Sequence, residues 1–460
     1  MKAPPYTLRS FIELAERESR RGNDISRLDP DVRKATRSLQ RRRELFLATI
    51  SKYERDDPAR ESIRMEYKEA REKLRQDRNA AVESALDQAV TSFEEKLDTG
   101  VFSFALRAGP VAGTKQTYCI DPALEILFPA KQAAEAIKSA ASIDAPNRNS
   151  IVRALKETLN KGYDHAIYKM DVQNFFESIP HSTLIDHLAR PMALDSVSAQ
   201  LARQLLSEYE AITGNEMGLP RGVGLSSQLA ELYMRDFDLK VRMHPGVLFY
   251  ARYVDDVIVV LENDQVLEAV KLVVDDQLQN LSLKIKNEKT HDVKADGKGN
   301  YDAADQVEYL GYRFVRIQNK LVTGLTDNRK LRREERLRLT LERWSSTDPN
   351  GTSPNYGNDG MLVDRVRYLA SNTKLLNSKS SVAIGLFHSN SALDESASEL
   401  VELDAILETF LAENHSNMTE DVRKRLESIS FVKMFSSRPF LRLRQKRIEQ
   451  IVRIWKEVGP

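Results

Sequence analysis

The chain has 460 residues, of which 41% are hydrophobic and 30% charged, a balance typical of a folded, helix-rich protein and not of a disordered one. It contains no apolar run long enough to cross a membrane and no secretory signal pattern, so we expect no membrane partner. The single cysteine, Cys119, excludes an internal disulfide and a multi-cysteine zinc site, which favours a reducing cytoplasm. Lysine and arginine number 69 against 68 acidic residues, so any grip on nucleic acid must come from local clusters.

The N-terminal third of the chain is predicted to be mainly helical. Residues 5–100 are dense in charge, with apolar residues at helical spacing. Glycine and proline recur between residues 100 and 130, which is typical of loops and short strands. The segment 131–159 is again expected to be helical, with a break before Ser150, a possible N-cap.

The spacing of apolar residues changes from helical to strand-like in the middle of the chain. Residues 166–170 predict a strand that ends at Asp171, and residues 247–261 predict a hairpin around Asp255-Asp256. A glycine-rich loop at 214–224 separates two helical segments. The other elements expected after residue 190 are helices at 194–213, 225–239 and 264–282, a short strand at 283–286, a second hairpin at 307–322, and helices from 327 onward, interrupted by a polar loop at 345–360.

This order of elements predicts an α+β fold in which helices cover one face of an antiparallel sheet. We expect three regions along the chain. They are a helical N-terminal extension at 1–100, a fingers-and-palm region at 101–326, and a helical thumb or C-terminal domain at 327–460.

Three aspartates stand where predicted strands end. Asp171 follows the first strand, and Asp255 and Asp256 occupy the turn of the hairpin. Nucleotidyl transfer uses two divalent ions about 4 Å apart, and Mg²⁺ takes oxygen ligands held on rigid elements. Acids beside buried strands are costly unless a cation or another partner is present. The pattern therefore predicts a site for two Mg²⁺ ions, with Mn²⁺ as a possible substitute.

The segments around these aspartates resemble reverse transcriptases. Residues 253–256 (Tyr-Val-Asp-Asp) match the Tyr-x-Asp-Asp box, and residues 171–176 look like the motif that precedes it. Residues 219–227 resemble the Pro-x-Gly loop, residues 289–290 the lysine motif, and residues 309–312 the primer-grip hairpin. Five motifs in the family's order imply a right-hand polymerase with fingers, an antiparallel palm sheet and a thumb.

The resemblance implies a catalytic role for each matching polar residue. Asp171 and Asp255 would be the main metal ligands, with Asp256 in support and the Val172 carbonyl completing the shell. Lys289 would protonate or neutralise the leaving pyrophosphate. The implied primer grip comprises Tyr309, Gly311 and Tyr312.

Substrate contacts are implied as well. Phe176 would stack under the incoming sugar and exclude a 2′-hydroxyl, which predicts a preference for deoxynucleotides. Arg221 and Gly222 belong to the loop that lets the template and the nascent base pair approach the backbone. Arg148 and Arg153, upstream of the first strand, would face the triphosphate.

Some positions depart from the common reverse-transcriptase pattern. Many members have glutamine where Arg221 stands and end the loop in Ser-Pro instead of Ser-Ser at 226–227. This form resembles bacterial reverse transcriptases of the defence-associated branch, which includes the unknown-group and abortive-infection enzymes, and residues 18–22 suggest the type 3 group within it. A guanidinium at 221 could hold a phosphate or the template backbone.

The resemblance implies a template of dedicated non-coding RNA, a DNA product, dNTP substrates, and a possible second polymerase subunit, effector or oligomer. Residues 321–325 look like the Val-Thr-Gly element of retron enzymes, so a retron-type product of branched RNA and DNA stays open. A catalytically silent RNA-binding scaffold is a further alternative, and Phe176 disfavours an RNA-dependent RNA polymerase. A basic cluster is expected to follow a duplex backbone as a thumb would, and it comprises Arg329, Lys330, Arg332, Arg333, Arg336, Arg338 and Arg343.

Overall fold

The computed structural model of the chain describes residues 6–143, 147–190, 194–295, 306–317, 320–346, 358–374, 382–395 and 397–458. The chain divides into two compact units, each described here by itself. The first unit comprises Met1–Asp144, Val172–Leu239 and Asp275–Ile285, and the second comprises Ala145–Asp171, Lys240–Val274 and Lys286–Pro460.

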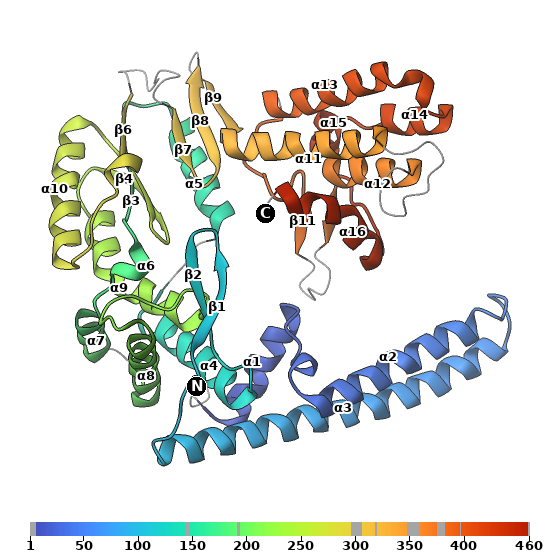
Figure 1. The fold of residues 1–460 in the computed structure, drawn as a ribbon, viewed down its shortest axis with the longest axis horizontal. Helices are drawn as coiled ribbons and strands as arrows, with labels where there is room; N and C mark the ends of the chain where they lie inside the picture. The colour runs from blue at the N-terminus through green and yellow to red at the C-terminus, as the bar shows by residue number, and fades with distance from the viewer. Residues whose placement is uncertain are drawn as a thin grey trace. The chain divides into compact units, whose positions relative to one another are not determined.

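The first unit is mainly helical and carries one short hairpin (Figure 1). The strands β1 (Arg107–Ala112) and β2 (Lys115–Cys119) pair antiparallel. Its helical elements are α1 (Leu8–Arg20), η1 (Ile25–Arg27), α2 (Pro30–Ile50), α3 (Ala59–Asp98), α4 (Leu124–Ala140), α6 (Phe175–Ser178), α7 (His181–Ala189), α8 (Ser196–Thr213) and most of α9 (Gly224–Arg242).

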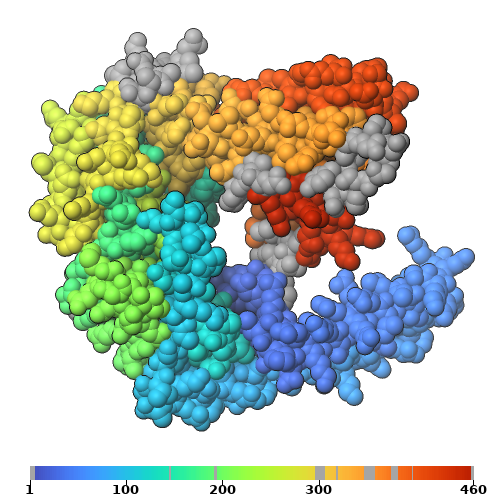
Figure 2. Space-filling view, viewed as in Figure 1, coloured from blue at the N-terminus to red at the C-terminus, as the bar shows by residue number. Residues whose placement is uncertain are grey.

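Helices α2 and α3 form a long hairpin that extends from the rest of the first unit (Figure 2). Helix α2 begins where the Asp29 carboxylate accepts a hydrogen bond from the Val32 amide at 2.8 Å, with Pro30 at the first helical position. The rings of Phe46 and Tyr67 stack across the two helices with 4.0 Å between centroids. The Phe46–Tyr67 contact joins α2 to α3, although few side chains of the two helices are buried.

The second unit contains a four-stranded sheet of order β4-β5-β3-β6 in which every neighbouring pair is antiparallel. The central strand β5 is a run of valine, isoleucine and leucine, and each of its residues from Val257 to Leu261 is at most 1% exposed. Burial at consecutive positions means that both faces of this strand are covered. The strands are β3 (Ala166–Asp171), β4 (Val247–Tyr253), β5 (Asp256–Leu261) and β6 (His291–Lys294).

Two smaller sheets and a group of helices complete the second unit (Figure 1). A large apolar cluster joins the four-stranded and three-stranded sheets to the helices of the C-terminal part, through residues such as Ile258, Tyr312, Leu337 and Leu403. The smaller sheets are β7 (Val307–Tyr309), β8 (Tyr312–Ile317) and β9 (Lys320–Leu325), and β10 (Asn372–Lys374) with β11 (Ala383–Gly385). The helical elements are α5 (Arg148–Asn160), α10 (Asp264–Asn280), η2 (Asn287–Lys289), α11 (Asp327–Ser345), α12 (Asp359–Ala370), α13 (Ser398–Glu413), η4 (His415–Asn417), α14 (Glu420–Glu427), α15 (Phe431–Ser437), α16 (Gln445–Val452) and η5 (Arg453–Val458).

The predicted α+β class with an antiparallel sheet is confirmed, but several details differ. Helices were expected on one face of the sheet, and the burial of strand β5 on both faces shows that its other face is covered as well. The N-cap of α5 is Asn147, whose side chain accepts a hydrogen bond from the Ser150 amide at 2.9 Å, so the helix starts before Ser150. Ile285, expected within a strand, makes only an isolated bridge to Val172.

The prediction also missed strands that have little apolar signal. Strand β6 lies at the edge of the sheet and is largely polar, and β10 and β11 are three residues each, in a region expected to be helical. No helix among the described residues is long and apolar enough to span a bilayer.

Candidate active site

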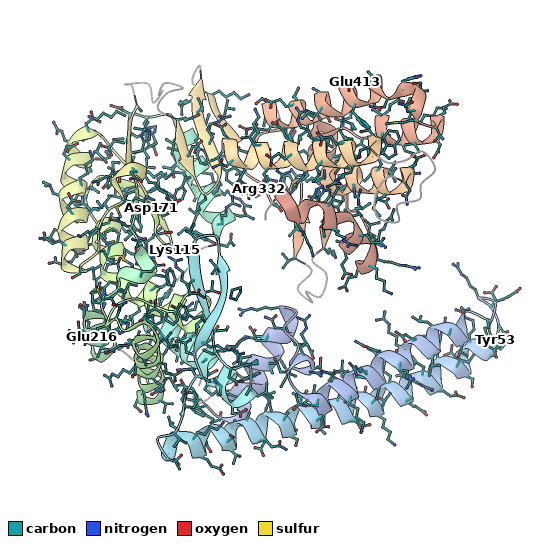
Figure 3. All side chains as sticks on the ribbon, viewed as in Figure 1. Tyr53, Lys115, Asp171, Glu216, Arg332 and Glu413 are labelled. Atoms are coloured by element: carbon teal, nitrogen blue, oxygen red, sulfur yellow. The ribbon has the colours of Figure 1, made fainter. Side chains whose placement is uncertain are left out.

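Strand pairing in the second unit brings two of the three predicted aspartates together. The β3–β5 register sets Asp171 directly opposite Asp256 at the end of both strands, and Figure 3 labels Asp171. The turn between β4 and β5 consists of Val254 and Asp255, so the third carboxylate adjoins the pair. Asp255-Asp256 was expected to form this turn. Asp256 is instead the first residue of β5, since it pairs with both Tyr253 and Asp171.

The turn that carries Asp255 has a strained backbone. Val254 has φ of 63°, a left-handed conformation that a β-branched residue rarely adopts. A two-residue hairpin turn needs a positive φ at its first central position, and this requirement falls on Val254 because no glycine is present. The Arg252 guanidinium donates to the Val254 carbonyl at 2.9 Å and so helps to hold the turn.

Tyr309, predicted as a primer-grip residue, supports the same hairpin from within the core. Its ring is 1% exposed, and its hydroxyl lies 3.1 Å from the Asp256 carbonyl and 3.4 Å from the Ala251 carbonyl. This buried hydroxyl helps to position the end of β5 that carries the Asp256 carboxylate. Its role toward a primer stays a prediction, and in this geometry it would act through the hairpin.

We predict that Tyr309→Phe lowers the expected polymerase activity, by far less than the loss of a metal ligand would, while it costs little stability. The substitution keeps the packed ring and removes a hydrogen bond worth about 1 kcal/mol. The free energy of unfolding should fall by that amount, while single-turnover primer extension falls by about ten-fold because the Asp256 strand end loses its support. Extension at the wild-type rate would contradict this positioning role.

The carboxylates differ in their electrostatic environment. Burial raises the pKa of Asp256 to about 6, with Asp171 and Asp255 adding to the rise, while Lys169 and Lys289 oppose it. Lys289 lies in η2, and its ammonium group donates to the Asp171 carboxylate at 2.6 Å. That hydrogen bond, against a smaller effect of burial, raises the pKa of Lys289. Lys289 therefore stays charged beside the acids, as its predicted role requires.

The donor set suits a hard divalent cation. The Asp256 Oδ1 atom is buried and has no hydrogen-bond donor among the described residues, and two further carboxylates stand beside it in sequence and in register. Among the described residues, no three acidic, histidine or cysteine side chains already converge as a metal cage. Mg²⁺ needs only one or two carboxylates and keeps its remaining waters. Asp171, Asp255 and Asp256 would hold it, and it would supply charge stabilisation to phosphoryl transfer.

Three other predicted residues of the second unit, Arg148, Gly311 and Tyr312, lie at the β7–β8 turn. Leu310 and Gly311 form this turn with φ of 48° and 75°. Arg148 donates to the Leu310 carbonyl, and Arg329 donates to the Gly311 carbonyl at 3.2 Å. Both guanidinium groups lie 5.2 Å from the centroid of the buried Tyr312 ring. In this structure the Arg148 guanidinium holds the β7–β8 turn. Its expected role toward a triphosphate stays a prediction.

Arg153, also expected near a triphosphate, is exposed on α5. Val172 immediately follows Asp171 and is 1% exposed. Their predicted roles toward substrate and metal remain predictions.

A second cluster of predicted residues lies in the first unit. Arg221 forms a two-pronged ion pair with Glu177, with distances of 2.8 and 3.0 Å. Its guanidinium carbon also lies 4.8 Å from the centroid of the Phe176 ring. Burial alone would raise the pKa of Glu177, but the hydrogen bonds and charge of Arg221 outweigh it and hold that pKa below its usual value. The ammonium of Lys115 adds a 3.4 Å ion pair to the same carboxylate.

Gly222 allows two backbones in the first unit to meet. The Tyr118 amide of β2 donates to the Arg221 carbonyl at 2.7 Å. Gly222 has φ of +95°, and a Cβ there would lie 2.8 Å from the Tyr118 carbonyl oxygen. The close approach expected at this glycine therefore includes the β1–β2 hairpin, while its predicted approach to a template stays a prediction.

We predict that Gly222→Ala destabilises the protein by about 2 kcal/mol, because a left-handed alanine costs about 1 kcal/mol and the contact with Tyr118 adds strain. Gly113→Ala is the matched control, since Gly113 has φ of +62° and nothing within 4 Å of the added atom. The free energy of unfolding of Gly113→Ala should fall only by the conformational cost of about 1 kcal/mol. Equal losses in urea unfolding would show that the contact with Tyr118 costs nothing.

Comparison with known protein families matches residues 126–314 to the family described as reverse transcriptase (RNA-dependent DNA polymerase). Residues 126–314 form a reverse transcriptase domain. This domain contains Asp171, Asp255, Asp256 and Lys289, and an RNA-directed DNA polymerase domain is what the motifs predicted. No curated protein matches the chain.

The solved structures that resemble the chain include telomerases of Candida tropicalis. Its apo telomerase truncated from the C-terminal domain is 13% identical with a TM-score of 0.34, over 43% of this chain and 45% of that one. Its apo telomerase is 11% identical with a TM-score of 0.36, over 72% and 53%. Its telomerase in complex with a TWJ fragment of telomeric RNA is 12% identical with a TM-score of 0.38, over 82% and 64%. The chain thus spans between 45% and 64% of these structures.

Two residues of the observed geometry were not foreseen from the sequence. Glu177 is the partner of Arg221, and no local signal links positions 44 residues apart. Arg252 was given no role, although it holds the Val254 turn. A positive-φ requirement at a hairpin lacking glycine is the signal that could have indicated a need for such support.

Proposed function

We propose that the chain is an RNA-directed DNA polymerase that uses two divalent ions, Mg²⁺ by preference, held by Asp171, Asp255 and Asp256. The observation that carries the proposal is the strand-end pairing of Asp171 with Asp256 inside a reverse transcriptase domain, beside Asp255 and the Lys289 ammonium. Lys289 is the proton donor or counter-charge for the leaving pyrophosphate.

The template we propose is a dedicated non-coding RNA, and the role is antiphage defence in the cytoplasm. Support comes from the departures of the Pro-x-Gly loop at Arg221 and residues 226–227, which resemble the defence-associated bacterial branch. Residues 18–22 suggest the type 3 group within that branch. DNA and dNTPs are the other partners, with a second polymerase subunit, an effector or a further copy of the chain as possible additions.

Activity on co-purified RNA tests the proposal. The purified chain with its bound RNA, Mg²⁺ and labelled dNTPs should yield a labelled product that resists alkali and is lost with DNase. Sequencing that product should return one RNA template, and labelled rNTPs should give far less incorporation. Labelled product that alkali destroys, or none in any metal, would refute the assignment.

A retron-type enzyme is the second candidate, supported by residues 321–325, which form part of β9. Its product would be DNA joined to a 2′-hydroxyl of the RNA, and a debranching enzyme would shift its mobility. An unshifted product excludes this candidate. A catalytically silent RNA-binding scaffold would bind the same RNA and incorporate nothing.

A further inference from the structure

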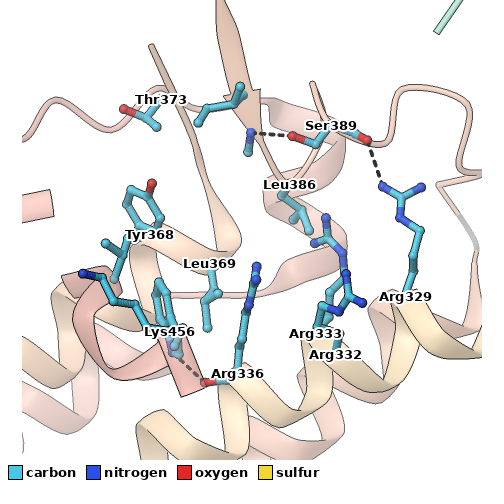
Figure 4. Close-up of a pocket in the computed structure, with 14 residues that line it drawn as sticks. Arg329, Arg332, Arg333, Arg336, Tyr368, Leu369, Thr373, Leu386, Ser389 and Lys456 are labelled. Atoms are coloured by element: carbon cyan, nitrogen blue, oxygen red, sulfur yellow. Dashed lines mark hydrogen bonds between the residues drawn. The ribbon is translucent and has the colours of Figure 1, made fainter. Parts of the chain in front are cut away.

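Four arginines of α11 line a pocket in the second unit. Arg329, Arg332, Arg333 and Arg336 recur at helical spacing, so they share one face of the helix. The pocket has a volume of about 660 Å³, and Lys456 brings a further positive charge to its rim. Figure 4 shows the arginines pointing from α11 into this space. None of its described lining residues is acidic, so the pocket is strongly positive.

The other walls are aromatic and apolar. The rings of Tyr368 and Trp455 stack with 5.9 Å between centroids and 28° between planes. The Trp455 indole is fixed, since it donates to the Arg336 carbonyl at 3.0 Å and to the Thr340 hydroxyl at 3.1 Å. Leu369 and Leu386 add apolar surface. The pocket thus combines a cationic side with a flat aromatic side.

The arginines differ in what they already bind. Arg329 is committed to the protein, because it donates to the Gly311 and Ser389 carbonyls and to the Asn390 side chain. Arg333 has no hydrogen-bond or ion-pair partner within the part of the chain that the structure describes. Burial and the charges of Arg329 and Arg336 lower the pKa of Arg333 to about 10, so it still carries its charge at neutral pH. A half-buried cation that is repelled by neighbouring arginines is costly unless an anion pairs with it.

We propose that this pocket binds a nucleoside polyphosphate, with its phosphates on Arg332, Arg333 and Arg336 and its base against Tyr368. Pockets of 300–1,000 Å³ enclose ligands of this size. Guanidinium groups match phosphate oxygens, and an aromatic face accepts any base. The nucleoside polyphosphate that binds is either a free nucleotide or the 5′-phosphorylated end of a nucleic-acid strand. The pocket is too small for a duplex, so nucleotide binding here is a different use of these arginines from the duplex contact expected for α11.

Calorimetry on the full chain tests the proposal with EDTA present, which removes metal-dependent binding at the carboxylates. dATP should bind to the wild type, and Arg333→Gln should weaken that binding about ten-fold through loss of charge-assisted hydrogen bonds. Tyr368→Ala should weaken the binding of dATP but leave the affinity for tripolyphosphate, which has no base, unchanged. Short RNAs with a 5′-triphosphate or a 5′-hydroxyl separate the two sources, because a strand-end site prefers the former over dATP.

Arg338→Gln is the matched control, since Arg338 lies on the same helix, is exposed and does not line the pocket. It should leave dATP binding unchanged, and Asp255→Ala should do the same. Arg333→Lys keeps the charge, should retain part of the affinity, and covers the case in which Arg333→Gln fails to fold. Wild-type dATP affinity in Arg333→Gln and Arg333→Lys, or no dATP binding by the wild type, would overturn the proposal. Neither outcome bears on primer extension at Asp255.

Discussion

Replacing Asp255 by asparagine should abolish DNA synthesis while leaving the fold intact. The side chain keeps its size and loses the charge that the proposed metal site requires. Stabilisation by a bound divalent ion amounts to several kcal/mol, and each 1.36 kcal/mol is ten-fold in rate. We therefore expect a fall of about 1,000-fold or more in single-turnover extension of a DNA primer on an RNA template.

The matched control for that experiment is Asp264→Asn. Asp264 begins α10 in the same unit, and its ion pair with Lys294 is exposed, with 56% of each side chain accessible. Exposed pairs contribute about 0–1 kcal/mol, so extension should stay within about two-fold of the wild type. Asp256→Asn should fall between the two variants, as expected of a supporting acid. If Asp255→Asn retains a tenth of the wild-type rate, Asp255 is not a catalytic ligand.

Replacing Phe176 by alanine should admit ribonucleotides. Phe176 follows Asp171 closely in sequence and is proposed to exclude the 2′-hydroxyl of the incoming sugar. Its ring contacts Phe175, at 5.6 Å between centroids, and the Arg221 guanidinium. These contacts favour one position of the ring, and its removal would open space that the sugar hydroxyl can use. We expect the preference for dNTPs over rNTPs, measured as the ratio of kcat/KM, to fall by about 10- to 200-fold.

Phe176→Tyr is the control, because it preserves the ring and its contacts with Phe175 and Arg221. Its selectivity should match the wild type, and thermal unfolding of both variants shows whether the cluster survives. Unchanged selectivity in Phe176→Ala, with folding intact, would remove Phe176 from the sugar-binding role.

The parts of the site that sequence could predict are those encoded by local pattern. The apolar runs before Asp171 and around Asp255 indicated the strands, because β-branched residues bounded by acids form a buried hairpin. The turn was displaced by one residue, since pattern alone does not show that Asp256 pairs with both Tyr253 and Asp171. The density of basic residues along 329–343 also indicated a charged helix, and α11 covers Asp327–Ser345.

What could not be predicted depends on contacts between distant segments. Nothing near Tyr309 shows that its hydroxyl meets the Asp256 carbonyl, since the two residues approach only when the β7–β8–β9 sheet packs beside the hairpin. The Arg148 guanidinium donates to the Leu310 carbonyl, which is 162 residues away in sequence, and no local pattern indicates that contact. The pocket walls at Tyr368 and Trp455 likewise reach α11 only through tertiary packing.

The position of β3 between β5 and β6 has a consequence for how the chain is made. During synthesis the segment Ala166–Asp171 leaves the ribosome well before either neighbour, so its backbone groups lack their partners until Lys294 has emerged. Asp171 and Asp256 therefore cannot face each other in a nascent chain that stops short of the β4–β5 hairpin. Ribosome-bound intermediates of this protein should lack the carboxylate pair until the β4–β5 hairpin has emerged.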